Sequence, residues 1–231
     1  MHSIQRVFTT WKSIPGNWDS LHAYELFESD NEYGIPLLEK SSRVPAQLVQ
    51  WGSRPELLAS PPDSAIHFFV GDYRFECIWK QPARYVDLIQ HDGSALTPDF
   101  SLFRDMPLAM QIWNVYRNRW LGCYWQSCGI EVIPTISWSQ PHDFCYAGVE
   151  QGSIVAISSV GLNDQKARYM FREGFERMVD VLRPEAILCY GKMPRDMQID
   201  NVITLPTRWE QKKNCRTLSF YEKILFEAGQ Q

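Results

Sequence analysis

Residues 153–190 read SIVAISSVGLNDQKARYMFREGFERMVDVLRPEAILCY, and this stretch sets the fold class. Its first apolar run, Ser153–Ile157, predicts a buried strand. Apolar side chains then recur at helical spacing over residues 164–182, and Arg183-Pro184 ends that helix. A second apolar run, Ala186–Tyr190, predicts another buried strand. The stretch is therefore a strand–helix–strand unit.

The same alternation extends outward in both directions. Further short apolar runs predict strands over residues 65–70, 94–97, 131–138 and 202–205, with helices between them. Strands of this kind are typical of a parallel sheet covered on both faces. We therefore predict an α/β fold with one mainly parallel sheet of about five to six strands in (β/α) units. The pattern fits a barrel-like arrangement or an open doubly wound sheet, and we favour the barrel-like one.

The clearest helix covers residues 109–124. Its apolar residues form one stripe along the helix: Ala109, Ile112, Trp113, Tyr116, Trp120, Cys123 and Tyr124. The polar residues Gln111, Asn114 and Asn118 fall on the opposite side. Asp105 is placed to cap the start of the helix, and Gly129 its end.

Residues 1–62 differ from the rest because prolines interrupt every periodic stretch; they are Pro15, Pro36, Pro45, Pro55, Pro61 and Pro62. Within this segment only residues 18–27 predict a short helix. We expect residues 1–62 to form an irregular extension packed on the main domain, and residues 63–231 to form a single α/β domain.

Composition narrows the protein class. Hydrophobic residues make up 45% of the 231 residues, which excludes a disordered chain, and the net charge of −4 argues against a dedicated nucleic-acid binder. The N-terminus lacks the apolar core of a signal peptide, and no run is long enough to span a membrane. The six cysteines fall in or beside predicted elements, as expected of reduced, buried residues. We therefore expect a cytoplasmic protein, and the sequence does not specify its oligomeric state.

Motifs containing rare residues occur in a fixed order between residues 65 and 192. They are Leu96-Thr97-Pro98-Asp99-Phe100-Ser101, then Asp105-Met106-Pro107, then Gln111-Ile112-Trp113-Asn114-Val115-Tyr116-Arg117, and later Val132-Ile133-Pro134. Together they resemble a bacterial and phage family catalogued as a domain of unknown function. The resemblance implies a cytosolic protein of a kind found in phages and mobile elements, and it implies no particular activity.

Two carboxylates follow neighbouring predicted strands. Asp72 comes after the strand at 65–70, and Asp99 after the strand at 94–97. In parallel α/β folds, ligands bind at the carboxyl ends of the strands. Asp99 and Asp72 are therefore the candidate catalytic residues, as an acid–base pair or as oxygen ligands of one divalent cation. The alternative is that both cap the helical turns that follow them.

Six further residues lie at the same predicted edge and are candidates for substrate binding: Ser101, Arg104, Asp105, Trp138, Ser159 and Tyr190. An arginine there can hold an anionic group, and Trp138 can provide a stacking surface. The turn at Ser159 can offer backbone N–H groups to a phosphate. The alternatives are an ordinary ion pair for Arg104, a core position for Trp138 and an ordinary turn at Ser159.

Other chemistry finds no support in the sequence. The five histidines are scattered, and no C-x-x-C or H-E-x-x-H spacing occurs, so a zinc site is not expected. Motifs of P-loop, dinucleotide-binding and G-x-S-x-G enzymes are also missing, and no cofactor is specified. Residues 207–216 form a basic tail that contains Trp209, which can contact phosphates or serve as a solvated surface.

Two hypotheses for function follow. The first is an enzyme, hydrolytic or nucleotide-directed, with an acidic site at the strand ends and a small-molecule or nucleotide ligand. The alternative is a non-catalytic accessory protein of a phage or mobile element that binds nucleic acid or protein. Convergence of Asp72, Asp99 and Arg104 on a concave rim favours the enzyme, whereas a flat rim with a continuous basic face favours the binding protein.

Overall fold

The computed structural model describes residues 25–52, 54–61, 63–91 and 93–213, in which strands alternate with helices. The strands are β1 (Gln47–Gln50), β2 (Ser64–His67), β3 (Ser94–Leu96), β4 (Glu131–Ile133), β5 (Val155–Ser158), β6 (Ile187–Tyr190) and β7 (Val202–Leu205). The helices are α1 (Arg54–Leu58), α2 (Glu76–Lys80), α3 (Pro82–Gln90), α4 (Leu108–Ser127) and α5 (Gln165–Leu182), with 3-10 turns η2 (Asp72–Arg74), η3 (Asp143–Cys145) and η4 (Arg195–Met197).

The described strands form two parallel sheets, one in the order β1-β2-β3-β4 and the other in the order β5-β6-β7. Every paired neighbour runs parallel. α-Helices connect the strands except between β4 and β5 and between β6 and β7, where the connections contain the 3-10 turns η3 and η4. The predicted α/β class built from (β/α) units is confirmed. The prediction of a single continuous sheet is wrong, because the strands divide between β4 and β5.

Pro134 explains this division. It follows β4 directly and has no N–H group to donate to a neighbouring strand. Its carbonyl still accepts a hydrogen bond from Ala156 N at 2.9 Å, and an isolated parallel bridge joins Thr135 to Ala156. The two sheets therefore meet at this bridge and do not form a regular ladder.

An inner apolar cluster shows that the two sheets curve around a shared core. Each strand of both sheets supplies residues to it or borders it: Leu48, Ala65, Leu96, Ile133, Ile154, Ala156, Ala186, Leu188, Tyr190 and Leu205. Along β6, Leu188 and Tyr190 point into this cluster, whereas Ile187 and Cys189 belong to the outer core. Sequential strand order around an inner core is the barrel-like arrangement, and β1 and β7 are not paired in the described ranges.

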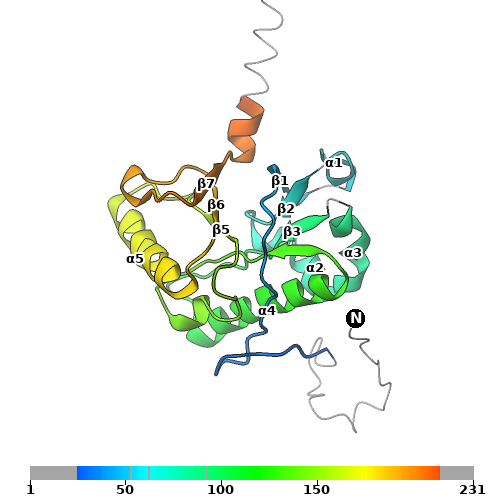
Figure 1. Ribbon diagram of the computed structural model, residues 1–231, viewed down its shortest axis with the longest axis horizontal. Coiled ribbons are helices and arrows are strands. Elements are labelled where there is room, and N and C mark those ends of the chain that lie inside the picture. Colours follow the sequence, from blue (N-terminus) through cyan, green and yellow to red (C-terminus); the bar gives the residue numbers. More distant parts are fainter. Residues whose placement is uncertain (1–24, 53, 62, 92, 214–231) are drawn as a thin grey trace, which may run out of the picture.

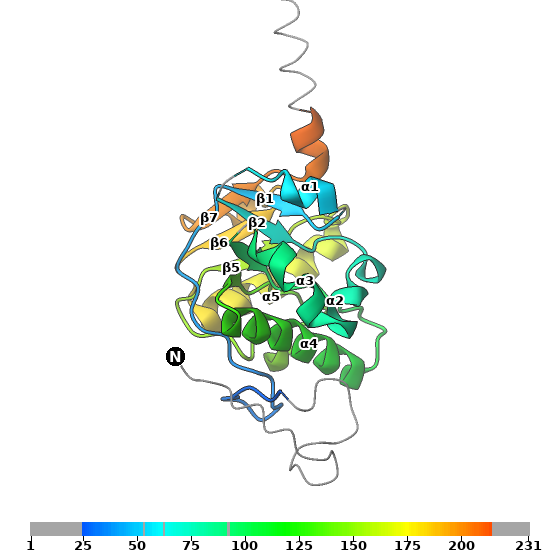
Figure 2. The same cartoon turned by 90° about the vertical axis from the view of Figure 1, so that its right-hand side faces the viewer.

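The outer core lies between the strands and the helices. In Figure 1, α5 flanks β5, β6 and β7, whereas α1, α2 and α3 flank the other sheet. Figures 1 and 2 both show α4 running along the base of the molecule. None of the helices in the described ranges is both long enough and apolar enough to cross a membrane.

The predicted apolar stripe of α4 is buried only in its second half. Trp120, Cys123 and Tyr124 are buried, whereas Trp113 is 44% exposed. The polar residues on the other side, Gln111, Asn114 and Asn118, are buried as well. The capping role predicted for Asp105 is wrong, since Pro107 occupies the N-cap position and no side chain caps the helix. Both faces of α4 carry large side chains, so spacing alone did not identify the buried one.

The segment expected to be irregular contains the first (β/α) unit. β1 pairs with β2, and α1 follows it, so residues 47–58 belong to the main fold. Residues 25–30 have no regular secondary structure, and residues 18–24 of the predicted short helix lie outside the described residues. Trp120 Nε1 on α4 donates to Glu25 O at 2.8 Å, so the described start of this segment packs against α4.

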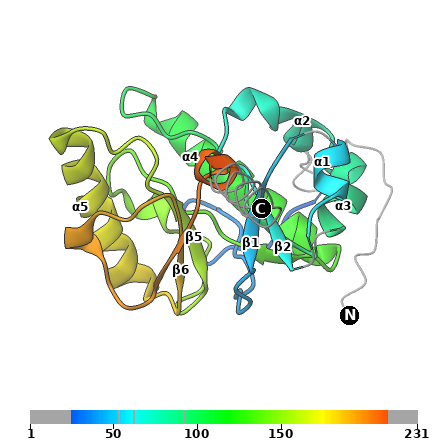
Figure 3. The same ribbon diagram turned by 90° about the horizontal axis from the view of Figure 1, so that it is seen from above.

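Residues 208–213 form a last helical segment after β7. Figure 3 shows this segment, coloured orange-red, above the space between the two sheets. Arg208 pairs with Glu56 of α1 at 3.0 Å, and Gln211 Nε2 donates to Leu48 O of β1 at 3.4 Å. These contacts join the end of the second sheet to the start of the first.

Candidate functional site

The loops after β3 and β4 are tied together at their first residues. Thr135 N donates to Thr97 Oγ1 at 2.7 Å, and Thr135 Oγ1 donates to Thr97 O at 2.7 Å. This reciprocal pair lies just past the ends of both strands, so it fixes where the two loops begin. Asp99 and Ser137 each follow two residues later, one on each loop.

Asp99 is half-buried and accepts a short hydrogen bond from Ser137 Oγ. Burial raises the pKa of Asp99 to about 6; the Ser137 hydrogen bond lowers it, and the negative charge of Asp72 raises it further. No ion pair within the described ranges includes Asp99. The carboxyl group therefore changes protonation close to neutral pH.

Asp72 comes from the loop after β2, and Ser101 holds both of its carboxylate oxygens. Ser101 N donates to Asp72 Oδ2 at 3.0 Å, and Ser101 Oγ donates to Asp72 Oδ1 at 2.8 Å. The structure thus brings Asp72, Asp99 and Ser101 together, as their positions in the sequence predicted. Neither carboxylate caps a helix, since Gly71 is the N-cap of η2 and Pro107 that of α4.

Buried polar side chains of α4 bind the backbone of the loop after β3. Asn118 Nδ2 donates to Pro98 O at 2.8 Å, and Asn114 Nδ2 donates to Ser101 O at 2.7 Å. Arg117 in turn donates to Asn114 Oδ1 at 2.6 Å and pairs with Glu76 at 3.0 Å. The two asparagines therefore anchor the backbone on either side of Asp99.

Arg119 holds the junction between the two sheets. Its buried guanidinium donates to the carbonyl oxygens of Ala147, Thr135 and Cys145 at 3.1, 3.0 and 3.1 Å. Burial lowers the pKa of Arg119 to about 10, although the carbonyl contacts satisfy its donors. Because Thr135 also makes the bridge between the sheets, Arg119 fixes their relative position at the loops near Asp99.

Two predicted site residues lie away from this centre. Arg104 is exposed and its Nη1 lies 3.9 Å from Met170 Sδ on α5. Asp105 is exposed as well. Arg104 therefore contacts neither Asp72 nor Asp99 among the described residues, so the full convergence that would favour an enzyme is not found.

Trp138 packs between the loop after β4 and α5. Its ring lies 5.3 Å from that of Phe171, and a Cβ built on Gly174 would lie 2.1 Å from Trp138 Nε1. Gly174 thus leaves the space that the indole fills. This is the core position that the sequence offered as the alternative to a stacking surface.

Tyr190 ends β6 in the second sheet, and Ser159 follows β5 directly. No hydrogen bond among the described residues joins either of them to Asp72 or Asp99. Ser159 is buried and its Oγ lies 3.4 Å from Tyr190 O. Tyr190 OH accepts a hydrogen bond from Arg208 N at 3.0 Å, and its ring lies 4.4 Å from that of His67. Tyr190 therefore links the inner end of β6 to β2 and to residues 208–213.

His67 is an inner residue that sequence reasoning set aside as one of several scattered histidines. It is fully buried at the end of β2, and its Nδ1 accepts a hydrogen bond from Phe69 N at 3.2 Å. Burial, with a smaller contribution from the charge of Arg208, lowers the pKa of His67 to about 3. The imidazole is therefore neutral at physiological pH. Side chains alternate between the two faces of a strand, so His67 on β2 shares the inner face with Ala65. This alternation is the signal in the sequence from which its inner position could be predicted.

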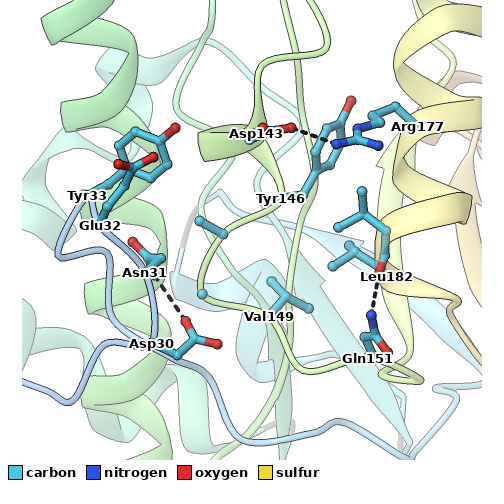
Figure 4. A pocket seen from close by; sticks show the side chains of 13 residues that line it. Asp30, Asn31, Glu32, Tyr33, Asp143, Tyr146, Val149, Gln151, Arg177 and Leu182 are labelled. Atoms are coloured by element: carbon cyan, nitrogen blue, oxygen red, sulfur yellow. Dashed lines mark hydrogen bonds and ion pairs between the residues drawn. The ribbon is translucent and has the colours of Figure 1, made fainter.

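Metal ligands are not clustered in the described residues, and one cavity of the molecule lies away from the strand ends. Among the described residues, no group of three or more His, Cys, Asp or Glu side chains is placed to hold a metal ion. Figure 4 shows the side chains that line a cavity near Asp30, Asp143 and Arg177. The volume of this cavity is about 500 Å³. Arg177 pairs with Asp143 at 3.0 Å, and the cavity lies beside residues that precede β5, away from the carboxyl ends of the strands.

Comparison with known proteins gives relatives but no activity. The model of a family described as "Domain of unknown function (DUF4417)" matches residues 27–206. The "Gene 1 protein" of Mycobacterium phage L5 is 44% identical over 213 residues, covering 90% of this chain and 93% of that protein. The "Gene 1 protein" of Mycobacterium phage D29 is 44% identical over 209 residues, covering 88% and 77%. No solved structure gives a significant match.

Proposed function

The chain belongs to the DUF4417 family, and we propose that it is an enzyme in which Asp99 transfers a proton at the carboxyl ends of β2, β3 and β4. The observation that carries the proposal is the meeting of Asp72 and Asp99 from consecutive loops at one edge of the sheet. Burial is the main reason that ionisation of Asp99 is unfavourable, and the negative charge of Asp72 raises the pKa of Asp99 further. Such paired carboxylates are typical of acid–base sites.

The two carboxylates have different roles. Both oxygens of Asp72 are occupied by Ser101, so Asp72 supplies fixed negative charge and positions the loop. Asp99 accepts a side-chain hydrogen bond from Ser137 and is half-buried, and the proposal requires that a ligand reach its carboxyl group. With a pKa of about 6, it is present in both protonation states near neutral pH. This suits a general acid or base in a hydrolytic reaction.

The surroundings favour a rigid site. Asn114 and Asn118 hold the backbone at Ser101 and Pro98, on both sides of Asp99. Proton transfer requires a carboxyl group that is held in place before the substrate arrives. All of these residues lie within the part of the chain that the family model matches.

A binding protein is the second candidate, and Trp209 is the observation that favours it. Trp209 is 72% exposed, and Lys213 Nζ lies 5.5 Å from its ring centroid. Two nearby cations are already paired, Arg208 with Glu56 and Lys192 with Glu210. A surface whose cations are partly ion-paired binds a nucleic-acid phosphate backbone less well than a continuous basic surface does.

The test is a hydrolysis screen of the full-length chain between pH 5 and pH 8, with phosphomonoesters, phosphodiesters, N-glycosides and amides as substrates. For the substrate that is turned over, we expect Asp99→Asn to lose activity at least 100-fold. We expect Asp72→Asn to remain active and to shift the acidic limb of the pH profile to lower pH. Asp105→Asn, an exposed acid nearby, is the matched control. An Asp99→Asn variant as active as the control would refute the assignment.

A further inference from the structure

A second cavity lies at the carboxyl ends of the strands of the second sheet. Its volume is about 690 Å³, and it lies among the loops after β5, β6 and β7. Neither Asp72 nor Asp99 lines it. Ligand cavities in proteins commonly have volumes of about 300 to 1,000 Å³, so its size fits a small organic molecule.

The charged groups of this cavity leave a positive excess. Arg168, Lys192 and Arg195 line it together with the acidic residues Asp196 and Glu210. Both acids are already occupied: Asp196 pairs with Arg172, and Glu210 accepts hydrogen bonds from Thr207 N and Oγ1 at 2.9 Å and lies 3.6 Å from Lys192 Nζ. The hydrogen bonds from Thr207 are the main cause that lowers the pKa of Glu210, which keeps it ionised.

Two arginines are left with donors for a ligand. The Nε of Arg168 donates to Leu162 O at 3.3 Å, and its terminal amino groups make no other side-chain bond within the described ranges. Arg195 makes no side-chain hydrogen bond or ion pair with a described residue. Guanidinium groups bind phosphate through two parallel hydrogen bonds, so this pair suits a phosphoryl group.

The third feature is an aromatic surface at the rim. Trp209 lines the cavity and remains 72% exposed, although an indole of this size usually packs against other residues. Exposed tryptophans beside cationic side chains are suited to stacking on a nucleobase. Arg168, Arg195 and Trp209 thus give one cavity with a phosphate-binding part and a base-stacking part.

We propose that this cavity binds a nucleoside 5′-phosphate, with the phosphate held by Arg168 and Arg195 and the base stacked on Trp209. A 5′-phosphate next to a nucleobase also occurs at the 5′ end of a single-stranded nucleic acid. Nucleotide binding in this cavity does not depend on the role of Asp99. The binding experiment below and the hydrolysis screen above can therefore fail independently of each other.

The experiment is isothermal titration calorimetry of the full-length chain with AMP, ribose 5-phosphate and adenosine. We expect AMP to bind more tightly than either fragment. In Arg195→Gln, affinity for AMP and for ribose 5-phosphate should fall at least fivefold. In Trp209→Ala, affinity for AMP should fall at least fivefold while that for ribose 5-phosphate is unchanged. Asp99→Asn should bind AMP as the wild type does.

Two controls protect the interpretation. Lys80→Gln and Tyr169→Ala change an exposed cation and an exposed aromatic that do not line the cavity, and we expect wild-type affinity from both. A 5′-phosphorylated single-stranded oligodeoxynucleotide separates the two sources: tighter binding than AMP assigns the site to strand ends, and weaker binding assigns it to free nucleotides. The proposal would be overturned if neither AMP nor the 5′-phosphorylated oligodeoxynucleotide bound. It would also be overturned if Tyr169→Ala and Trp209→Ala lost AMP affinity equally.

Discussion

Asn118 on α4 donates its side-chain amide to the carbonyl of Pro98 at 2.8 Å, one residue before Asp99. The same amide also lies within 3.4 Å of Thr135 O, on the loop after β4. One buried asparagine therefore contacts the two loops that carry Asp99 and Ser137. The position of Asp99 depends on a helix that lies outside the sheet.

Removal of this contact should cost stability. In Asn118→Ala the carbonyl of Pro98 loses a buried donor, and we expect the free energy of unfolding to fall by about 1 to 3 kcal/mol. Chemical denaturation measures this change. Asn163→Ala, at an exposed position before α5, is the matched control and should change stability by less than about 0.5 kcal/mol. Equal effects in the two variants would show that the contact contributes little.

Asp99→Asn should leave stability at pH 7.5 unchanged or raise it by up to about 3 kcal/mol. The folded pKa of about 6 lies above the value of 3.8 for an unperturbed aspartate, so Asp99 destabilises the fold once it is ionised. Its contribution is favourable below about pH 4 and is lost as pH rises through 6. Denaturant midpoints at pH 4 and pH 7.5 test this sign.

A helix-cap variant, Asp164→Ala, is the reference that distinguishes a functional Asp99 from a structural one. Asp164 caps α5 by accepting from Ala167 N at 2.8 Å, and Asp164→Ala should cost about 0.5 to 2 kcal/mol. If both Asp99→Asn and Asp99→Ala lost as much stability as Asp164→Ala, Asp99 would be a structural residue.

His67 should make the opposite contribution. Its folded pKa of about 3 lies below the unperturbed value of 6.5, so stability is present above pH 6.5 and is lost as pH falls toward 3. In the Asp99→Asn background, which removes the opposing effect, we expect a loss on the order of 2 kcal/mol between pH 7 and pH 5. The double variant with His67→Gln should lose this slope. Identical slopes with and without His67 would mean that the imidazole is not held neutral.

Gly174 provides a test of the position of Trp138. Alanine at 174 would place its Cβ 2.1 Å from Trp138 Nε1, so we expect Gly174→Ala to lower the melting temperature and cost about 1 to 3 kcal/mol. Combining it with Trp138→Phe, which shortens the side chain, should restore part of the loss. Additive losses in the double variant would indicate that Trp138 does not occupy this space.

The sequence predicted the parts of the fold that depend on short-range patterns. The strand–helix–strand unit of residues 153–190 and the cap at Asp164 follow from apolar periodicity and capping chemistry. The proximity of Asp72 to Asp99 follows from the rule that neighbouring parallel strands end at one edge. The family resemblance carried by the motifs between residues 65 and 192 is confirmed as well.

The remaining features depend on contacts that patterns do not encode. β1 is short and lies between Pro45 and Pro55, so its pairing with β2 leaves no periodic signal. α4 buries polar as well as apolar side chains, because Asn114 and Asn118 bind loop carbonyls, and Trp113 in the predicted apolar stripe is 44% exposed. Ser137 belongs to the site because its hydroxyl donates to Asp99 from the loop after β4. The two residues are far apart in the sequence, so no local pattern predicts this contact.

The central claim is that Asp99 exchanges a proton near neutral pH, and the most direct measurement is the pKa of its carboxyl group. A ¹³C NMR titration of the Asp99 carboxyl signal, assigned by its absence in Asp99→Asn, provides it for the full-length chain. We predict a midpoint near pH 6 and a lower midpoint in Asp72→Asn, because that substitution removes a neighbouring negative charge. A midpoint at or below about pH 4, the range of an ordinary aspartate, would contradict the account.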